Sequence, residues 1–410
     1  MAKTNERNVV SFFSSAKLMD IKKEIEQIYP EIVKIRRHLH ENPELSEHEE
    51  KTAAYVCDIL DKHNIKYQSG IAGFGIVAQI GGGSKAVGIR ADMDALPVLE
   101  ATDLDFASKT DGVMHACGHD IHTAILLGSA MLLKKMENKI NRVDGAVKLF
   151  FQPAEETVGG AEKMIAAGCL ENPKVDRVIS LHIDPVYPSG SVIFKYGAMN
   201  AATQGFNIIV NGKSCHGAHP EGGIDAIVVA SEIVTSLQTI SSRFNAPTTP
   251  VIVTVGAFHA GDAGNVIAGT AKLTGTVRAL APDVMDASKE QLERIARGIA
   301  SAYGGTAEVI WHNDGYPALI NDDETTALVE SCAKELYGDE NIIIMPEPSL
   351  GADDFAYFTE AAKGCYFNIG VTKQGETIHP LHNEHLSPDE ESMKTGIAVE
   401  IASVIKMLFT

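Results

Sequence analysis

The chain has 410 residues, which is too long for a single ordinary core and predicts two or three domains of about 100 to 200 residues each. Hydrophobic residues make up 45% of the chain and charged residues 22%, which excludes a disordered protein. The 54 acidic and 35 basic residues give a formal net charge of −19, which repels nucleic acid and anionic membranes. We therefore expect neither nucleic acid nor a membrane as a partner.

The cysteines and the N-terminus indicate the compartment. The six cysteines are scattered without a CxxC pair, so they indicate neither a disulfide framework nor a thiolate zinc knuckle. Polar residues interrupt the short apolar patch near the N-terminus. No apolar stretch reaches the ~18 residues that a membrane span requires. We expect a cytoplasmic chain with a frayed leader.

Strand and helix patterns alternate in the first half of the chain. Apolar residues at helical spacing occupy 18–64, and four β-branched runs follow at 75–80, 86–92, 146–152 and 177–183. Helix-like stretches separate the later runs. This alternation predicts an α/β fold with a mainly parallel sheet.

A second pattern occupies residues 200–312. Alternating strands there enclose two long amphipathic helices, Asp225–Arg243 and Pro282–Tyr303, which predicts a βαββαβ sandwich. Helix and strand patterns resume in 313–410, and we expect them to complete the first sheet. The sequence therefore predicts a larger domain made of 1–199 and 313–410, interrupted by a smaller α+β domain.

Histidine, cysteine and acidic residues gather at four places where predicted strands end. The segments are MHACGHDIH (114–122), QPAEE (152–156), SLHID (180–184) and IHPLHNEHL (378–386). Open α/β sheets place their sites at the carboxyl ends of the strands. Thiolate, imidazole and carboxylate groups from separate segments are typical of a metal site. The sequence therefore predicts such a site.

Spacing within these segments suggests roles for individual residues. Cys117 and His119 precede a helix that Asp120 is expected to cap, and in extended backbone both side chains point toward one locus. Glu155 and Glu156 are adjacent, and burying both requires a nearby cation. One can bind metal while the other moves a proton. Taken singly, each of these residues has a plainer interpretation: a histidine as a structural residue, the paired glutamates as solvated acids and Cys117 as a small core residue.

Ten sequence blocks carry a family resemblance. In chain order they are RRHLHENPELSEHE, RADMDALPV, MHACGHDIHTA, FFQPAEE, LHID, GKSCHGAHPEGGIDAI, GNVIAGT, GTVRAL, GADDFAYF and PLHNEHLSPDE. They resemble the M20 metallopeptidase family, specifically its amidohydrolase branch, which includes hippurate hydrolases, indole-acetyl-amino-acid hydrolases and N-acetyl-amino-acid deacetylases. The HACGHD and QPAEE blocks together are the most specific.

The resemblance implies a catalytic α/β domain interrupted by a smaller lid or dimerisation domain, and a centre of two divalent metal ions. Carried over by position, the metal ligands are Cys117, His119, Glu156, His182 and His382. Glu155 is implied as the general base. Asp94, which with Asp92 matches the acidic pair of the DMDALP block, is placed in the catalytic group.

Three residues of the inserted domain match positions that the family uses near the substrate. His216 matches the GKGxH position and is assigned a catalytic role, whereas Asn265 and Arg278 are assigned to substrate binding. The planar guanidinium of Arg278 matches a substrate α-carboxylate. Because these residues lie in a separate domain, they act only if that domain closes or a second subunit delivers them. We therefore expect a homodimer or homotetramer.

The implied reaction is hydrolysis of the amide bond of N-acyl-amino acids or short peptides, with metal-activated water and Glu155 as the base. The ligand set suits zinc, manganese, cobalt or nickel better than magnesium or calcium. The sequence departs from the branch at Asp353, Ala268 and His219, where glutamate, proline and an apolar residue are usual. None of these three positions is a proposed ligand.

Two other functions stay open. Cys117 is a candidate nucleophile activated by a histidine in a cysteine hydrolase. A non-catalytic ligand-binding homologue is the other, because a fold does not fix a function. A zinc nucleobase deaminase fits poorly, because its PCxxC partner is absent from the sequence.

Overall fold

The computed structural model describes residues 15–157, 159–313 and 315–409. Most of the expected N-terminal leader lies outside these residues. The chain divides into two units, each with its own hydrophobic core. Unit 1 is Met1–Gly197, Ile320–Glu347 and Asp353–Thr410, and unit 2 is Ala198–Leu319 and Pro348–Ala352.

Unit 1 is built on an eight-stranded sheet in the order β1-β2-β4-β3-β5-β16-β6-β15. The central strands β4, β3, β5 and β16 are parallel, whereas β1 and β2 pair antiparallel at one edge. Apolar residues fill the central strands, as expected where helices cover both faces of a parallel sheet. The strands are β1 (Lys66–Ile71), β2 (Gly75–Ile80), β3 (Lys85–Asp92), β4 (Gly145–Gln152), β5 (Val175–Pro188), β6 (Val192–Phe194), β15 (Ile342–Ile344) and β16 (Lys363–Thr372). The expectation of a mainly parallel α/β sheet is confirmed.

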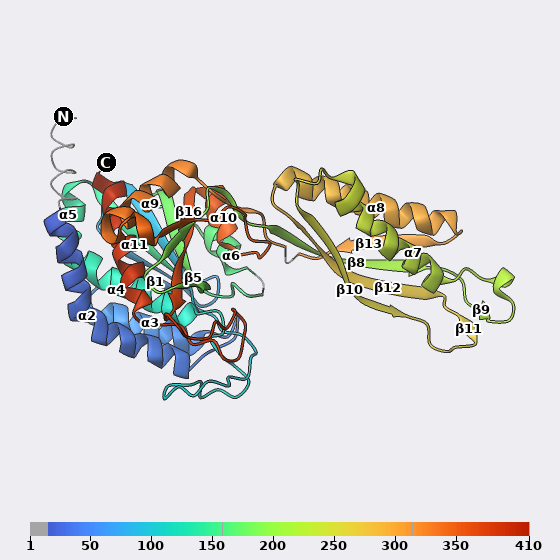
Figure 1. Ribbon diagram of the computed structural model, residues 1–410, viewed down its shortest axis with the longest axis horizontal. Helices are drawn as coiled ribbons and strands as arrows, with labels where there is room; N and C mark the ends of the chain where they lie inside the picture. Colours follow the sequence, from blue (N-terminus) through green and yellow to red (C-terminus); the bar gives the residue numbers. More distant parts are fainter. Residues whose placement is uncertain (1–14, 158, 314, 410) are drawn as a thin grey trace. The chain divides into compact units, whose positions relative to one another are not determined.

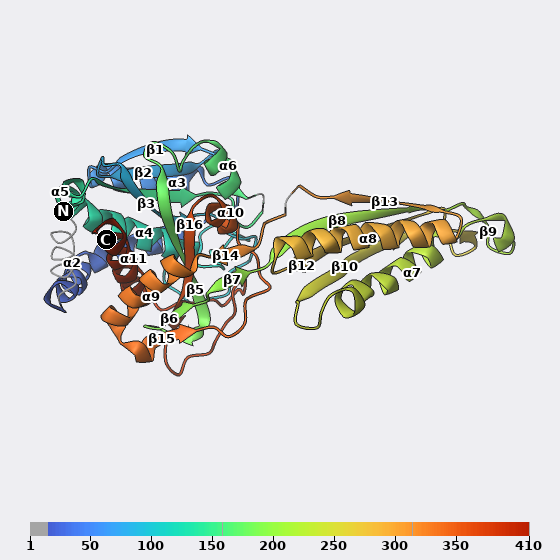
Figure 2. The ribbon, with the colours of Figure 1, turned by 90° about the horizontal axis from the view of Figure 1, so that it is seen from above.

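Helices cover the two faces of this sheet. Helices α4 and α11 pack on one face, where α2 lies over them, and α6 and α10 pack on the other (Figure 1, Figure 2). Among the described helices, none combines the length and the hydropathy that a membrane crossing requires. The helices of unit 1 are α2 (Ser15–Glu41), α3 (Glu50–Lys62), α4 (His119–Lys135), α5 (Glu137–Arg142), α6 (Gly160–Ala166), α9 (Asp323–Tyr337), η3 (Asp339–Asn341), α10 (Phe355–Ala361) and α11 (Ser392–Phe409).

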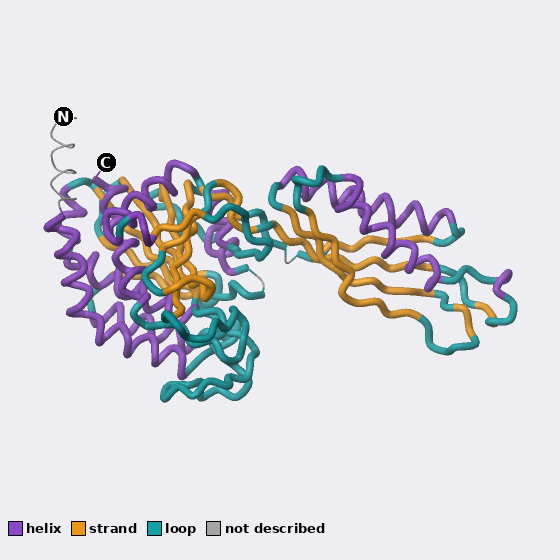
Figure 3. The backbone as a smooth tube through the Cα atoms, viewed as in Figure 1, coloured by secondary structure: helices purple, strands orange, loops and turns teal. Residues whose placement is uncertain are grey.

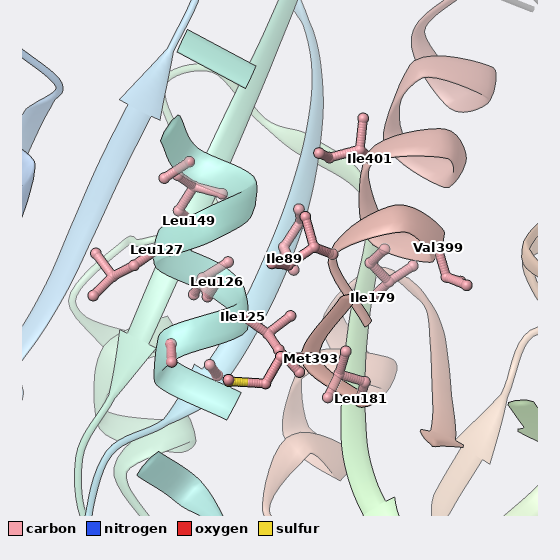
Figure 4. Packing of buried hydrophobic residues seen from close by; sticks show 14 of the residues in the cluster. Ile89, Ile125, Leu126, Leu127, Leu149, Ile179, Leu181, Met393, Val399 and Ile401 are labelled. Atoms are coloured by element: carbon pink, nitrogen blue, oxygen red, sulfur yellow. The ribbon is translucent and has the colours of Figure 1, made fainter. Parts of the chain in front are cut away.

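The core of unit 1 lies between the helices and the sheet. Figure 4 shows Ile125 of α4, Met393 of α11 and Leu181 of β5 packed in one cluster. All three side chains are almost fully buried. Burial of each such side chain contributes about 1.5–3 kcal/mol, so this packing holds α4 firmly against the strands. The first turn of α4 carries His119, and the core therefore fixes one side of the candidate site.

Unit 2 has an antiparallel sheet in the order β10-β12-β8-β13, with α7 and α8 packed on one face (Figure 3). The element order is the βαββαβ pattern expected from the sequence, with a small two-stranded sheet of β9 and β11 added. Asp225 caps α7, because its carboxylate accepts hydrogen bonds from the N–H groups of Ile227 and Val228. The elements are β8 (Ala202–Asn211), β9 (Cys215–His216), η1 (Pro220–Gly222), α7 (Ala226–Thr239), η2 (Ile240–Phe244), β10 (Val251–Ala260), β11 (Val266–Ile267), β12 (Thr270–Ala279), α8 (Pro282–Ala302) and β13 (Thr306–Trp311). Two further short strands, β7 (Gly197–Asn200) and β14 (Leu319–Asn321), stand where the chain passes between the units.

Candidate metal centre

The candidate site lies at the carboxyl ends of the central strands of unit 1. Asp92 and Gln152 end β3 and β4 and are paired partners in the parallel ladder. His182 follows Ser180 of β5, which pairs with Arg90 of β3, so His182 reaches the same edge of the sheet. The sheet register therefore brings together segments that are far apart in the sequence, as the strand-end clusters predict.

The five side chains of the expected ligand set surround one locus. Cys117 Sγ lies 3.3 Å from His182 Nε2, and His382 Nε2 lies 3.3 Å from Glu156 Oε1. His119 Nε2 lies 3.8 Å from the same glutamate oxygen. Cys117 belongs to two triads, one with His119 and His182 and one with Glu156 and His382, and within each triad the ligand atoms lie within 4.8 Å of one another.

A left-handed glycine places Cys117 and His119. Gly118 has φ 85° and precedes the first residue of α4, so the backbone turns here and is not extended as the sequence suggested. The expectation that Asp120 caps α4 is also wrong, because no side chain of the described residues caps this helix. Asp120 Oδ2 instead lies 2.9 Å from Arg36 Nε, in a buried ion pair.

The imidazole of His119 shows that this locus favours positive charge. Its Nδ1 must carry a proton, because both of its partners are acceptors: the carbonyl oxygen of Asp94 at 2.9 Å and the carboxylate of Asp94 at 3.2 Å. The other nitrogen, Nε2, is buried and makes no hydrogen bond with any described residue. Burial alone would lower the pKa of His119, but the carboxylates of Asp92, Asp94 and Glu156 raise it to about 10. The same carboxylates would stabilise a cation bound at Nε2, so these residues fit a metal ion.

A second histidine, His122, supports the site without being able to bind metal. Its Nε2 accepts a hydrogen bond from the N–H of Ile183 at 3.0 Å, so Nδ1 carries the proton and donates to Asp92 Oδ1 at 2.7 Å. Both ring nitrogens are therefore occupied. The bond to Ile183 holds β5 next to His182, which is the positioning role that hydrogen-bonded neighbours of metal ligands commonly have.

Glu155 is buried among other acids, and a buried arginine compensates their charge. One oxygen from each of Glu155, Asp353 and Asp354 lies within 4.8 Å of the others. Burial and the neighbouring carboxylates raise the pKa of Glu155 well above its usual value. Arg90, almost fully buried, donates to Asp92 Oδ2 and to Asp354 Oδ1, each at 2.7 Å. No role was predicted for Arg90 from the sequence, although a charged residue within the apolar strand GIRAD is a usable signal.

Comparison with known proteins decides the family. Residues 88–406 match the family described as peptidase family M20/M25/M40. The chain belongs to this family. Thermostable carboxypeptidase 2 of Saccharolobus solfataricus is 38% identical over 392 residues, which cover 94% of this chain and 98% of that protein. N-acetyl-L-cysteine deacetylase of Bacillus subtilis is 40% identical over 352 residues, which cover 85% of this chain and 82% of that protein.

A solved structure of an M20 protein agrees with this assignment. A Bacillus subtilis protein described as a dinuclear metal-binding peptidase of the M20 family matches with a TM-score of 0.79 at 33% identity. The match covers 93% of this chain and 99% of that one. The chain is accordingly an amide-bond hydrolase of a metal-dependent family, and the resemblance stated from its sequence blocks is confirmed.

The three M20 residues expected near the substrate lie at opposite ends of unit 2. His216 is paired with Val266 in the two-stranded sheet of β9 and β11, and the carbonyl of Asn265 accepts a hydrogen bond from the N–H of Gly217, the residue after His216. This small sheet follows the Asn211 end of β8 (Figure 1). Arg278 pairs with Thr203 at the other end of β8, where its Nη1 donates to the carbonyl of Leu350 at 2.8 Å. The stretch of β12 between these ends spans about 27 Å.

Proposed function

We propose that this M20 hydrolase cleaves the amide bond of N-acyl-amino acids with two divalent cations. Cys117, His119, Glu156, His182 and His382 would hold the ions, which the thiolate, imidazole and carboxylate set suits to zinc, manganese, cobalt or nickel. The observation that carries the proposal is the convergence of these ligand atoms, with Glu155 beside them. Relatives named as deacetylases of N-acetylcysteine and N-acetyldiaminopimelate support this substrate class.

The residues around the ions would divide the work of hydrolysis. When bound, two divalent ions lower the pKa of water and stabilise an oxyanion. Glu155 would accept the proton of the attacking water and return it to the leaving amine, and its raised pKa suits both transfers. Asp94 would keep Nδ1 of His119 protonated, so that Nε2 is free to bind a cation.

Unit 2 would bind the rest of the substrate. Arg278 would take the α-carboxylate with the part of its guanidinium that does not contact Leu350. His216 and Asn265 lie about 27 Å away along the sheet, farther than the length of an N-acyl-amino acid. One copy of unit 2 therefore cannot bring all three residues to one substrate. We propose a homo-oligomer in which a second subunit supplies His216 and Asn265.

The test is a pair of cysteine variants. Cys117→Ala should lose bound metal and hydrolysis of N-acetyl-amino acids, because it removes a ligand shared by both triads. Cys57→Ala, in α3 and outside the site, should keep both. Elemental analysis for bound metal and an assay of released amino acid measure the two effects. Full metal occupancy in Cys117→Ala would contradict the proposed ligand role.

One observation favours a second candidate, a cysteine hydrolase. Cys117 Sγ lies 3.3 Å from His182 Nε2, within reach of a thiolate–imidazole pair. However, burial and the carboxylates of Glu156 and Glu155 raise the pKa of Cys117 well above its usual value. Burial and nearby His122 lower the pKa of His182, so the charged pair is disfavoured without cations. Hydrolysis that persists after chelation of all metal would establish this second mechanism.

A further inference from the structure

A buried carboxyl group that binds none of the candidate ligands contacts the turn that carries Glu155 and Glu156. Glu49, which immediately precedes α3, is 0% exposed. Its Oε1 accepts a hydrogen bond from the N–H of Ala154 at 2.7 Å. Its other oxygen, Oε2, is buried and has no hydrogen-bond partner among the described residues. Burying a carboxyl group with one unpaired oxygen is costly, which indicates a role beyond packing.

The residue that Glu49 holds has an unusual backbone conformation. Ala154 has φ 55°, in the left-handed region that costs an alanine about 1–2 kcal/mol. Its carbonyl accepts hydrogen bonds from the N–H groups of Gly159 at 3.1 Å and Gly160 at 3.2 Å. Such a conformation persists only where surrounding contacts impose it. The hydrogen bond from Ala154 to Glu49 is one of these contacts.

A second carboxylate holds the other side of the turn. Asp94 Oδ2 accepts a hydrogen bond from the N–H of Glu156 at 3.0 Å and another from Ser46 Oγ at 2.6 Å. The N–H groups on either side of Glu155 are therefore both bound to buried carboxylates. Ser46 and Glu49 belong to the same connection between α2 and α3, so this connection contacts the turn directly and through Asp94.

We propose that Glu49 is a positioning residue, which fixes the Ala154 turn and thereby directs Glu156 to the metal locus and Glu155 to its separate place. The inference rests on the proposed metal site. Glu49 acts through the backbone and touches neither metal nor substrate. Residues that orient metal ligands in this way typically change metal affinity by about 10–100-fold when removed.

Three variants test the inference by titrating the metal-free protein with zinc alone. Glu49→Leu removes the acceptor and should weaken zinc binding about tenfold or more. Glu49→Gln keeps a carbonyl acceptor for Ala154, and because burial already raises the pKa of Glu49 to about 7, a neutral side chain should retain zinc binding. Ala154→Gly, added to Glu49→Leu, should restore most of the lost affinity, because glycine adopts a positive φ without the steric cost.

Glu400→Leu is the matched control. Glu400 is as deeply buried as Glu49 and accepts a hydrogen bond from Ser129 Oγ at 2.6 Å, in the layer between α11 and α4. Its removal should change the unfolding midpoint but leave zinc affinity unchanged. If the only effect of Glu49→Leu were the loss of a buried carboxyl group, it would behave like this control.

Three results would overturn the proposal. Wild-type zinc affinity in Glu49→Leu, with only a lower unfolding midpoint, would show a purely structural role for Glu49. Failure of Ala154→Gly to restore zinc affinity would show that the turn is not what Glu49 controls. If Glu49→Leu does not fold, a tenfold loss of affinity in Glu49→Gln is sufficient to refute the idea. A protein that binds zinc but hydrolyses no N-acyl-amino acid would refute the substrate assignment alone.

Discussion

Gly118 separates Cys117 from His119, and a single added methyl group there tests how strictly the fold sets their spacing. A Cβ atom at Gly118 would lie 2.3 Å from Cδ1 and 2.8 Å from Cγ1 of Ile183. Ile183 is 1% exposed and stands next to His182 on β5, so its side chain has no open space to enter. Gly118→Ala therefore forces either α4 or β5 to move.

Two separate costs determine how much Gly118→Ala lowers the free energy of unfolding. The left-handed φ of 85° at Gly118 costs an alanine about 1–2 kcal/mol. Overpacking against Ile183 adds about 1–3 kcal/mol. We expect Gly118→Ala to lower the free energy of unfolding by about 2–5 kcal/mol. It should also weaken zinc binding, because the displaced elements carry His119 and His182.

Urea unfolding and zinc titration measure these effects, and Gly190→Ala separates the two costs. Gly190 has φ 93°, but no atom of the described residues lies within 4 Å of its added Cβ, so it carries the backbone cost alone. It should lose about 1–2 kcal/mol and keep its zinc affinity. Ile183→Ala combined with Gly118→Ala should show a favourable coupling, because the clashing atoms are gone. Equal losses in Gly118→Ala and Gly190→Ala, with unchanged zinc affinity, would refute the reasoning.

Three more predictions concern the acids and the arginine. Glu155→Gln should keep its metal but lose about 10²-fold or more in turnover, whereas Glu156→Gln should lose metal. Elemental analysis and turnover measurements would show the reverse pattern if the two glutamates have exchanged roles. Arg278→Lys should lose activity mainly on N-acyl-amino acids and little on the corresponding amides, and equal losses would mean that it binds no carboxylate. Burial raises the pKa of Glu400 from 4.5 to about 8. The stability that its neutral form gives is therefore fully present below pH 4.5 and is lost progressively until the pH reaches about 8. Glu400→Gln should be more stable than wild type by about 3–5 kcal/mol at pH 9 and not at pH 4, and an equal difference at both would contradict the shift.

The location of the site followed from the sequence because a parallel sheet has a simple geometric rule. The carboxyl ends of its strands meet at one edge, so QPAEE after β4 and SLHID in β5 are brought together by the sheet itself, whereas HACGHD reaches this edge at the start of α4. The chemistry of the residues then predicted a cation. The family resemblance added His382, which the spacing alone did not distinguish from the histidines near it.

The contacts of the supporting residues could not be predicted in this way, because their partners are remote and follow no spacing rule. Arg90 and Asp354 are 264 positions apart, and Glu49 and Ala154 are 105 apart. Asp120 looked like a helix cap because it stands at the start of a helix, but the buried guanidinium of Arg36 is a stronger partner than the backbone. Only the folded chain shows which of these contacts is made.

The charges of the site predict that metal binding and folding are linked. Six acids lie around the locus: Asp92, Asp94, Glu155, Glu156, Asp353 and Asp354. Taking each carboxylate out of water costs several kcal/mol unless positive charge is close. Arg90 offsets part of this cost on the side of Asp354, and on the side of the ligand set protonated His119 and His382, whose pKa values are both raised, supply positive charge. Divalent cations would replace these protons and compensate the remaining acids, and they would do so only in the folded chain, where the ligands meet. A variant that loses a ligand should therefore lose stability together with activity, so its bound metal has to be measured before lost turnover is assigned to chemistry.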